Sequence, residues 1–277
     1  MLTRKGKPVL LFALTGCIFL LLLLFYVIMP FTKKDLNDFE FMDSIALSVG
    51  TVKASFQGNI THNNGGVNYT YIYPKYFAHL RHNRINFLEI GIFKGQSVRL
   101  WEQYFPNAEL HFIDIEERKH VIEYFSARSQ YHFIDNKDSE RLRKFALAFG
   151  PFDFIVDDAD HSMLGQITSF EVLFPFVKPG GIYIIEDLFT SYSRIYNYEL
   201  TRIEKDYHGL PAGPGTTIQY LKNLVDDIYY VSKRNGLANF GNVSGIFPEM
   251  YSNMSYYAKH IEAIHFYDSI CFVLKRS

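Results

Sequence analysis

The sequence predicts an α/β protein built on a Rossmann-like, doubly wound parallel sheet with helices on both faces. Two observations support this prediction. From Tyr69 onward, short apolar segments alternate with stretches of helical length, a pattern typical of βαβ units. The last two apolar segments are joined only by Asp268 and Ser269, too short a link for a parallel crossover, so the final pair must be antiparallel.

The expected elements follow one another in strict alternation. Strands are expected at 87–90, 110–113, 131–134, 152–156 and 182–185, with helices at 96–105, 117–129, 139–149 and 163–174, and a closing pair of strands at 263–267 and 270–274. Lys178-Pro179-Gly180-Gly181 is expected to form a tight turn before the fifth strand. A hydrophobic content of 48% is sufficient for one ordinary domain with a substantial core.

Ahead of this domain, the uncharged segment from Val9 to Met29 predicts a transmembrane helix. At about 1.5 Å per residue it would span roughly 30 Å, the thickness of the hydrocarbon core of a bilayer. Arg4, Lys5 and Lys7 precede it and place the N-terminus in the cytoplasm. Bulky residues follow it where a cleavage site would need small ones, which favours a retained signal anchor over a cleaved signal peptide.

This segment leads to a type II membrane topology. We expect a cytoplasmic tail at 1–8, a signal anchor at 9–29, a stem at 30–68 and the α/β domain at 69–277. The domain would face the lumen of the Golgi or endoplasmic reticulum, where four N-x-[ST] sites are N-glycosylation candidates. These sites are Asn59, Asn68, Asn242 and Asn253.

Overall charge and cysteine content exclude some classes of function. The net charge of −1 does not indicate a strongly basic surface, so binding to nucleic acid through phosphate contacts is not expected. Cys17 and Cys271 lie near opposite ends of the chain, which indicates neither a disulfide framework nor a cysteine-based metal site.

Carboxylates occur at or near the ends of five consecutive predicted strands. They are Glu89, Asp114, Asp135, Asp157 with Asp158, and Glu186 with Asp187. The carboxyl ends of parallel strands meet at the edge of the sheet where ligands bind. A single acid there is usually a helix cap, a role that suits Asp138 and Asp160, but five in succession predict a site for a cationic or hydroxyl-rich ligand.

The loop after the first strand carries Gly91 and Gly95. Glycines let the backbone approach a ligand at a helix N-terminus, although glycines that only pack the core remain an alternative. The spacing is G-x-x-x-G instead of G-x-G-x-x-G, which disfavours a dinucleotide. Asp114, about twenty residues further on, is placed to bind ribose hydroxyls.

A second group of acids predicts a metal site. Asp158, Glu186 and Asp187 would supply hard oxygen ligands that suit Mg²⁺, Mn²⁺ or Ca²⁺ and not zinc, with a set of caps and surface acids as the alternative. His161 follows Asp158 closely. Because histidine side chains titrate near neutral pH, His161 is a candidate general base beside a metal-bound hydroxyl.

Taken in order, these motifs resemble the macrocin/mycinamicin-type sugar O-methyltransferases, which are class I, S-adenosylmethionine-dependent enzymes. The resemblance runs from about Tyr69 to Lys275. It is carried by Phe87–Gly91, Trp101–Ala108, Ile113–Ile115, Phe152–His161, Pro179–Leu188 and Thr190–Tyr192.

The resemblance implies a seven-stranded doubly wound domain with an antiparallel last strand, and it implies roles for individual residues. Cofactor contacts are expected at Glu89, Gly91, Gly95, Ser97 and Asp114, with Asp135 and Asn136 near the adenine and Asp157 in the same set. Mg²⁺ (or Mn²⁺) is expected on Asp158, Glu186 and Asp187, with His161 as the base. Ala159-Asp160 replaces the Gly-Ser that is usual in the family. The extra acid is expected to raise the pKa of His161 or to change which substrate is accepted.

The expected activity is methyl transfer from S-adenosylmethionine to a sugar hydroxyl of a glycan in the secretory pathway, with the membrane contacted through one N-terminal helix. Two alternatives remain. One is the same chemistry on a lipid or small secondary metabolite, and the other is an inactive glycan-binding protein of the same fold. The oligomeric state stays open, with a homo-oligomer as one option.

Overall fold

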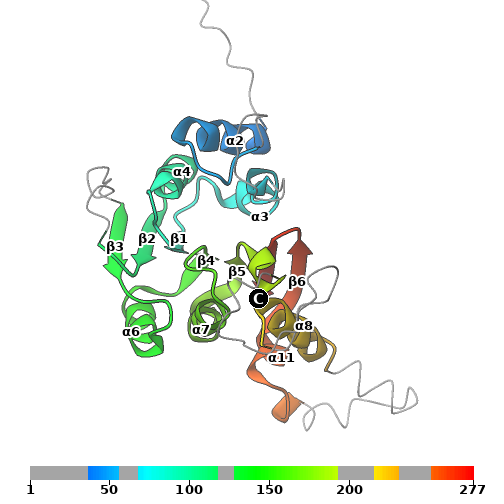
Figure 1. Ribbon diagram of the computed structural model, residues 1–277. Helices are drawn as coiled ribbons and strands as arrows, with labels where there is room; N and C mark the ends of the chain where they lie inside the picture. The colour runs from blue at the N-terminus through cyan, green and yellow to red at the C-terminus, as the bar shows by residue number, and fades with distance from the viewer. Residues whose placement is uncertain (1–36, 56–67, 118–127, 193–214, 231–250) are drawn as a thin grey trace, which may run out of the picture.

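A seven-stranded sheet in the order β3-β2-β1-β4-β5-β7-β6 lies at the centre of the structure, a computed structural model that describes residues 37–55, 68–117, 128–192, 215–230 and 251–277 (Figure 1). Strands β1 to β5 pair in parallel, whereas β7 is antiparallel to both of its neighbours, β5 and β6. The predicted Rossmann-like fold with an antiparallel last strand is therefore confirmed.

The elements follow the predicted alternation closely. The strands are β1 (Asn86–Ile90), β2 (Glu109–Asp114), β3 (Ser129–Phe133), β4 (Phe152–Asp157), β5 (Val177–Ile185), β6 (Ile261–Tyr267) and β7 (Ile270–Lys275). The described helices are α2 (Asp38–Val49), α3 (Pro74–Phe77), α4 (Gln96–Tyr104), α6 (Ser139–Phe149), α7 (Met163–Leu173), α8 (Thr217–Ile228) and α11 (Tyr256–His260), with 3₁₀ turns η1 (Tyr69–Tyr71), η2 (Ala78–Leu80), η3 (Phe174–Phe176) and η4 (Leu188–Tyr192). Most of the helix expected at 117–129 lies outside the described residues.

One predicted turn is instead part of a strand. The segment from Lys178 to Gly181 lies within β5, which begins at Val177. Its pairing with β4 shifts register between Phe152 and Phe154, and Gly180 adopts a φ of 75°. The Pro179-Gly180-Gly181 sequence that predicted a turn is accommodated by this irregularity in the strand.

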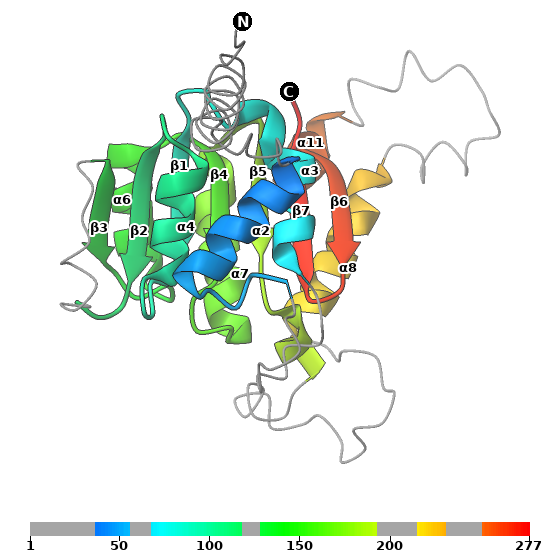
Figure 2. The ribbon, with the colours of Figure 1, turned by 90° about the horizontal axis from the view of Figure 1, so that it is seen from above.

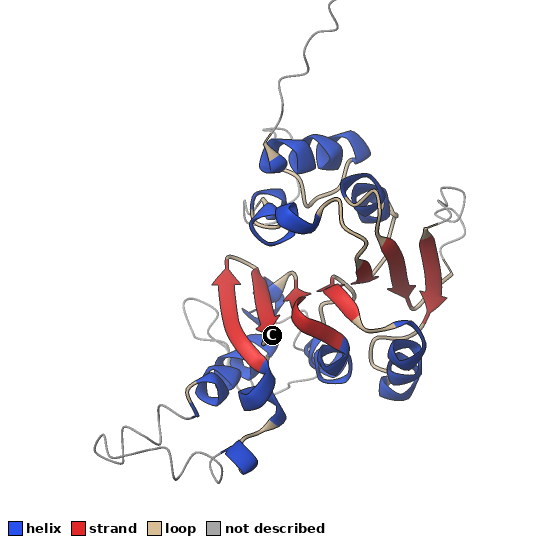
Figure 3. Ribbon diagram, turned by 180° about the vertical axis from the view of Figure 1, so that it is seen from behind, coloured by secondary structure: helices blue, strands red, loops and turns tan. Residues whose placement is uncertain are grey.

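Helices cover both faces of the sheet (Figure 3). On one face, α2, α3 and α4 pack over apolar side chains such as Phe87, Phe154 and Ile184 (Figure 2). On the other face, α6, α7 and α8 cover a second cluster that includes Ile155 and Tyr183. Successive strand residues alternate between the two clusters, because side chains along a strand point to opposite faces.

Part of the segment expected as a stem packs onto the domain. A capping box between Asn37 and Glu40 starts α2, and Gly50 ends it in the left-handed conformation with a φ of 74°. Met42 and Ala46 are fully buried in the core beneath this helix. Residues 38–55 therefore contribute to the same core as the residues after Tyr69, and the expected boundary at 68 falls inside the packed region.

Within the described residues, no helix has both the length and the apolar character needed to cross a membrane. The predicted anchor at 9–29 lies outside those residues, as do Asn59 and Asn242. Of the remaining glycosylation candidates, Asn68 precedes η1 and Asn253 is exposed on the surface.

Candidate functional site

A cleft of about 570 Å³ opens at the carboxyl ends of the parallel strands. Seven of the residues predicted for the site line it, namely Gly91, Asp114, Asp135, Asn136, Asp158, His161 and Asp187. Apolar side chains complete the walls, among them Ile113, Ile134 and Phe189. A concave site of this size with a few convergent polar groups is typical of a small-molecule or cofactor site.

The alternation of side chains along the strands decides where each acid points. Glu89 lies two residues beyond Phe87, and Glu186 two residues beyond Ile184, so both carboxylates face the layer of α2 and α4. Asp158 follows Val156 on the same side, and all three acids meet there. Asp157 has the opposite orientation.

Gly91 allows a close approach between the glycine loop, which follows β1 and carries Gly91 and Gly95, and the backbone just after β4. Its φ is 104°, and a Cβ at this position would lie 2.0 Å from the carbonyl oxygen of Asp158. Only glycine fits both constraints. The close approach is to protein backbone, as in the alternative of packing glycines, and the cofactor contact of Gly91 stays a prediction.

Asp114 organises the same loop through its carboxylate. Oδ2 accepts hydrogen bonds from the backbone N–H groups of Ile92 (3.0 Å) and Phe93 (3.2 Å), and Oδ1 accepts from Glu116 (3.1 Å). These hydrogen bonds tie the end of β2 to the loop that carries Gly91 and Gly95. Asp114 lines the cleft and fixes this loop, and its contact with ribose hydroxyls stays a prediction.

Asp135 and Asn136 lie at the far wall of the cleft, after β3. The amide of Asn136 donates to Oδ1 of Asp160 at 3.0 Å, and Lys137 Nζ lies 2.7 Å from Oδ2 of the same residue. Burial alone would raise the pKa of Asp160, but these bonds hold it below its ordinary value. Asp160 therefore links the loop after β4 to the segment after β3, because Asn136 and Lys137 both contact its carboxylate.

Three predicted cofactor residues support the cleft without lining it. Ser97 Oγ donates to Oε2 of Glu89 at 2.8 Å, and both side chains are buried. Gly95 precedes α4 with a φ of 72°. Burial raises the pKa of Glu89 to about 7, although nearby Lys53 opposes the rise. Glu89 and Ser97 therefore hold β1 and α4 together across the loop that carries Gly91 and Gly95.

The position of Asp157 does not fit the cofactor contact expected for it. Its fully buried carboxylate points toward α7 and β5, where Oδ2 accepts hydrogen bonds from Ser169 Oγ and from Tyr183 Oη at 3.1 Å. Burial raises its pKa to about 7. Asp157 is therefore a packing and hydrogen-bonding residue, because strand alternation turns it away from Asp158.

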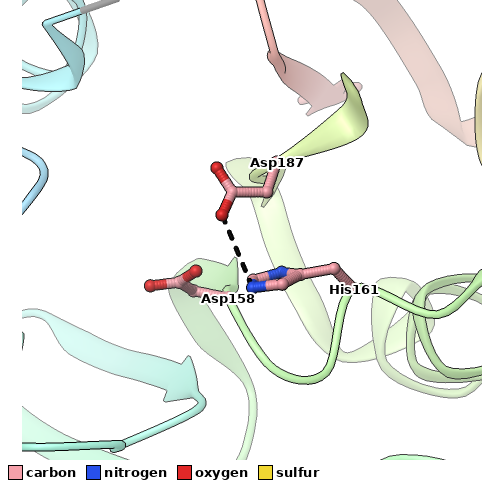
Figure 4. Close-up of side chains that lie close together, drawn as sticks. All are labelled: Asp158, His161 and Asp187. Carbon is pink, nitrogen blue, oxygen red and sulfur yellow. Dashed lines mark ion pairs between the residues drawn. The ribbon is translucent and has the colours of Figure 1, made fainter. Parts of the chain in front are cut away.

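Asp158, His161 and Asp187 form the chemical centre of the cleft (Figure 4). Ligand atoms of the three side chains all lie within 4.8 Å of one another, and Nε2 of His161 is 3.4 Å from Oδ2 of Asp187. Two carboxylates with one imidazole suit an oxygen-preferring divalent ion. The structure thus brings together two of the three predicted metal ligands and the predicted base.

Two residues of this centre have strained backbone. His161 and Asp187 adopt φ values of 55° and 54°. The left-handed region costs a non-glycine residue roughly 1–2 kcal/mol. Such strain is typical of functional sites, where the surrounding structure holds a side chain in a required direction.

Glu186, the third predicted ligand, is not part of the group formed by Asp158, His161 and Asp187. Its carboxylate accepts a hydrogen bond from Tyr73 Oη and lies 2.5 Å from Nζ of Lys53. Tyr69 plays a similar part for Asp187, whose Oδ1 accepts from Tyr69 Oη at 2.8 Å. Burial and Asp158 raise the pKa of Asp187, whereas His161 and Tyr69 oppose the rise.

Lys53, Tyr69 and Tyr73 were not predicted as site residues. Lys53 is separated from Asp158 by 105 positions and has no motif around it. The capping box at Asn37 and Glu40, followed by apolar residues at helical spacing, is a signal that could have placed α2 in the domain. It could not have shown that the loop after α2 reaches the acids.

Comparisons with known proteins find similar methyltransferases. Residues 88–188 match the family described as a methyltransferase domain. The chain is 31% identical over 210 residues to mycinamicin VI 2''-O-methyltransferase of Micromonospora griseorubida, covering 73% of this chain and 47% of that protein. It is 34% identical over 187 residues to L-olivosyl-oleandolide 3-O-methyltransferase of Streptomyces antibioticus, covering 63% of this chain and 45% of that protein.

A solved structure of the MycE methyltransferase from the mycinamycin biosynthetic pathway, in complex with Mg, SAH and mycinamycin VI, is similar in fold. It matches with a TM-score of 0.64 and 27% identity, covering 87% of this chain and 55% of that one. The chain spans about half the length of the curated relatives it matches.

Proposed function

We propose that this chain, which belongs to the macrocin/mycinamicin-type family of class I, S-adenosylmethionine-dependent sugar O-methyltransferases, transfers a methyl group to a sugar hydroxyl with the help of a divalent ion. The observation that carries the proposal is the convergence of Asp158, His161 and Asp187 at the mouth of a cleft at the carboxyl ends of the strands. That place is where parallel sheets bind their ligands.

The cleft fits the methyl donor. Asp114 lines it and holds the loop of Gly91 and Gly95 in place, and Ile113, Ile115 and Ile134 supply apolar walls. S-adenosylmethionine would supply an electrophilic methyl group on its sulfonium centre. The carboxylates of Asp158 and Asp187 would favour that positive charge near the same end of the cleft.

The same carboxylates fit Mg²⁺ or Mn²⁺. Asp158 and Asp187 provide oxygen ligands, and their ligand atoms lie within 4.8 Å of each other and of a nitrogen of His161. A bound ion would supply positive charge beside the acceptor hydroxyl and lower its pKa. This chemistry requires a base, and a ring nitrogen of His161 lies within that distance of both carboxylates.

His161 is that base in our proposal. The proton of the acceptor hydroxyl would pass to Nε2, the nitrogen that lies 3.4 Å from Asp187. Asp187 would stabilise the imidazolium that results, and Tyr69 holds Asp187 in place through its 2.8 Å hydrogen bond. The strained backbone at both residues keeps the pair aligned, and alignment of reactants is a large part of catalysis.

The acceptor in this proposal is the sugar of a glycan in the secretory pathway. The relatives are named for methylation of mycinamicin VI and of an olivosyl-oleandolide, both glycosylated molecules, which supports a sugar hydroxyl as the acceptor. The apolar segment 9–29 and the N-x-[ST] sites support a luminal setting. The alternative is a lipid or small-molecule acceptor at a membrane surface, and the acceptor test must distinguish it from a glycan.

The test is methyl transfer by the full chain from labelled S-adenosylmethionine to a panel of free hexosides, N-glycans and glycolipids, with and without chelator. We expect label in a sugar, lost with chelator and regained with Mg²⁺. Asp158→Asn and His161→Ala should each lower the rate at least ~100-fold. Label in a lipid portion alone would overturn the glycan acceptor.

Asp153→Asn is the matched control. Asp153 lies near the beginning of β4, whereas Asp158 follows the end of that strand, and Asp153 pairs with Lys178 at 2.7 Å. Its removal should leave the rate within about threefold. Full activity of Asp158→Asn and His161→Ala in chelator would contradict the mechanism, whereas cofactor binding without transfer to any acceptor would favour an inactive glycan-binding protein.

A further inference from the structure

Lys53 places a buried positive charge among three acids of the site. Its side chain is 2% exposed, and Nζ lies 2.6 Å from Oδ2 of Asp158, 2.5 Å from Oε2 of Glu186 and 3.6 Å from Oε1 of Glu89. Burial alone would lower the pKa of Lys53, but Asp158, Glu186 and Glu89 raise it well above its ordinary value. The side chain is therefore an ammonium ion in this setting.

A network of hydrogen bonds holds the loop that carries Lys53 in this position. The loop that carries it leaves α2 at Gly50, and the backbone N–H of Thr70 donates to the carbonyl oxygen of Lys53 at 3.2 Å. Asp43 on α2 accepts from the N–H and the hydroxyl of Ser55, at 2.7 and 2.5 Å, and from the hydroxyl of Thr70 at 2.7 Å. These bonds hold the loop at both ends.

Asp158 is shared between Lys53 and the divalent-ion site. Its Oδ2 contacts the ammonium, while its carboxylate also belongs to the group with His161 and Asp187. Glu186 is engaged by the same ammonium and by Tyr73. Buried carboxylates this close repel one another, and an ammonium among them offsets the repulsion when no metal is bound.

We propose that Lys53 is the counter-charge of Glu89, Asp158 and Glu186. It stabilises the metal-free fold and competes with the divalent ion for Asp158. The inference rests on the ion site of the proposed function but not on its acceptor or on turnover. It makes Lys53 a positioning residue that sets how tightly the ion is held. A weakly held ion would be the result of this competition, and removal of the ammonium would strengthen its binding.

The experiment measures Mn²⁺ binding and thermal unfolding of the full chain, without substrate. Lys53→Met keeps most of the length and apolar character of the side chain and removes its charge. We expect Mn²⁺ to bind Lys53→Met at least ~10-fold more tightly than the unaltered chain, because a positive charge in contact with one ligand has gone. In chelator the variant should melt at a lower temperature, and excess Mn²⁺ should restore most of the loss.

Lys53→Gln provides a second measurement. Its neutral amide keeps donors that can reach the carboxylates, so it tests the charge separately from the hydrogen bonds. Tighter Mn²⁺ binding is expected here too. This variant decides the question if Lys53→Met does not fold in either chelator or Mn²⁺.

Lys275→Met is the matched control for loss of a buried lysine. Lys275 is 6% exposed, but its Nζ donates to the backbone carbonyls of Phe174, Pro175 and Val177, near the opposite end of the sheet. Its loss should lower the melting temperature in chelator and in Mn²⁺ alike, and should leave the affinity for Mn²⁺ within about twofold.

Mn²⁺ binding to folded Lys53→Gln or Lys53→Met that is equal to or weaker than that of the unaltered chain would overturn the inference. Absence of Mn²⁺ binding in both the unaltered chain and the variants would overturn it as well. Failure of methyl transfer to every acceptor, with the expected pattern of Mn²⁺ affinities, would instead reject the proposed function and leave the role of Lys53 standing.

Discussion

His161 and Asp187 face each other across the cleft with Nε2 and Oδ2 3.4 Å apart, and both residues hold left-handed backbone to do so. The arrangement comes from two separate loops, one after β4 and one after β5. A relaxed backbone at either residue would redirect its side chain. The local strain is therefore linked to the geometry of the proposed base and its partner.

The strain predicts an unusual order of stability among variants of His161. Asparagine tolerates left-handed backbone better than alanine does, so His161→Asn should be more stable to urea than His161→Ala by about 1 kcal/mol. Both variants should lack transfer activity. At exposed His82, which is not among the residues with positive φ, the same two substitutions should differ by less than about 0.5 kcal/mol. Equal stabilities at position 161 would show that the backbone there is unstrained.

Asp114 and Asp157 should differ in their effect on cofactor binding, although both end strands of the same sheet. Asp114→Asn weakens the acceptor that holds the glycine loop and should reduce affinity for S-adenosylmethionine at least ~10-fold. Asp157→Asn faces Ser169 and Tyr183 and should leave that affinity within about threefold. Isothermal titration calorimetry measures both. A large loss of affinity in Asp157→Asn alone would contradict the orientation described for it.

The two stacked histidines under α6 should make stability depend on pH. Nδ1 of His111 and Nε2 of His132 are 3.3 Å apart, beside Phe145 and Phe149. Burial, and then His111, lower the pKa of His132 to about 4, and burial lowers that of His111 as well. In the unfolded chain the same groups bind protons near pH 6.5, so their contribution to stability is present above that pH and is lost as the pH falls toward 4.

His132→Gln should therefore lose less stability on acidification. Between pH 7 and pH 5 its melting temperature should fall by at least ~3 °C less than that of the unaltered chain. His82→Gln, at an exposed position, serves as the control and should follow the unaltered chain. Parallel pH curves for all three proteins would rule out the histidine pair as a source of acid sensitivity.

The packing of α2 predicts that the segment expected as a stem is needed for the fold. Met42 is fully buried, so Met42→Ala should destabilise the protein by about 2–4 kcal/mol in urea unfolding. Leu147, which is 66% exposed on α6, supplies the control, and Leu147→Ala should change stability by less than about 0.5 kcal/mol. A negligible effect at Met42 would mean that α2 does not contribute to the core.

Most of the fold could be predicted from local patterns. Helix α6 has the bounds expected from its periodicity, with Asp138 as the predicted cap, and the Asp268-Ser269 link produced the expected antiparallel pair of β6 and β7. These features depend on neighbours in sequence, where period, capping and turn length are physically decisive. The packing of α2 could not be predicted in this way, because the core that buries it is formed by residues far along the chain.

By itself, the sequence determined the order of strands and helices, the presence of acids at the strand ends, and the resemblance to the sugar O-methyltransferases. The tertiary structure decided which acids meet. Strand alternation sends Asp157 away from Asp158, left-handed backbone turns Asp187 toward His161, and the loop after α2 brings Lys53 to Glu186 across 133 positions. Such contacts depend on how distant segments pack in three dimensions, and no local pattern of residues encodes them.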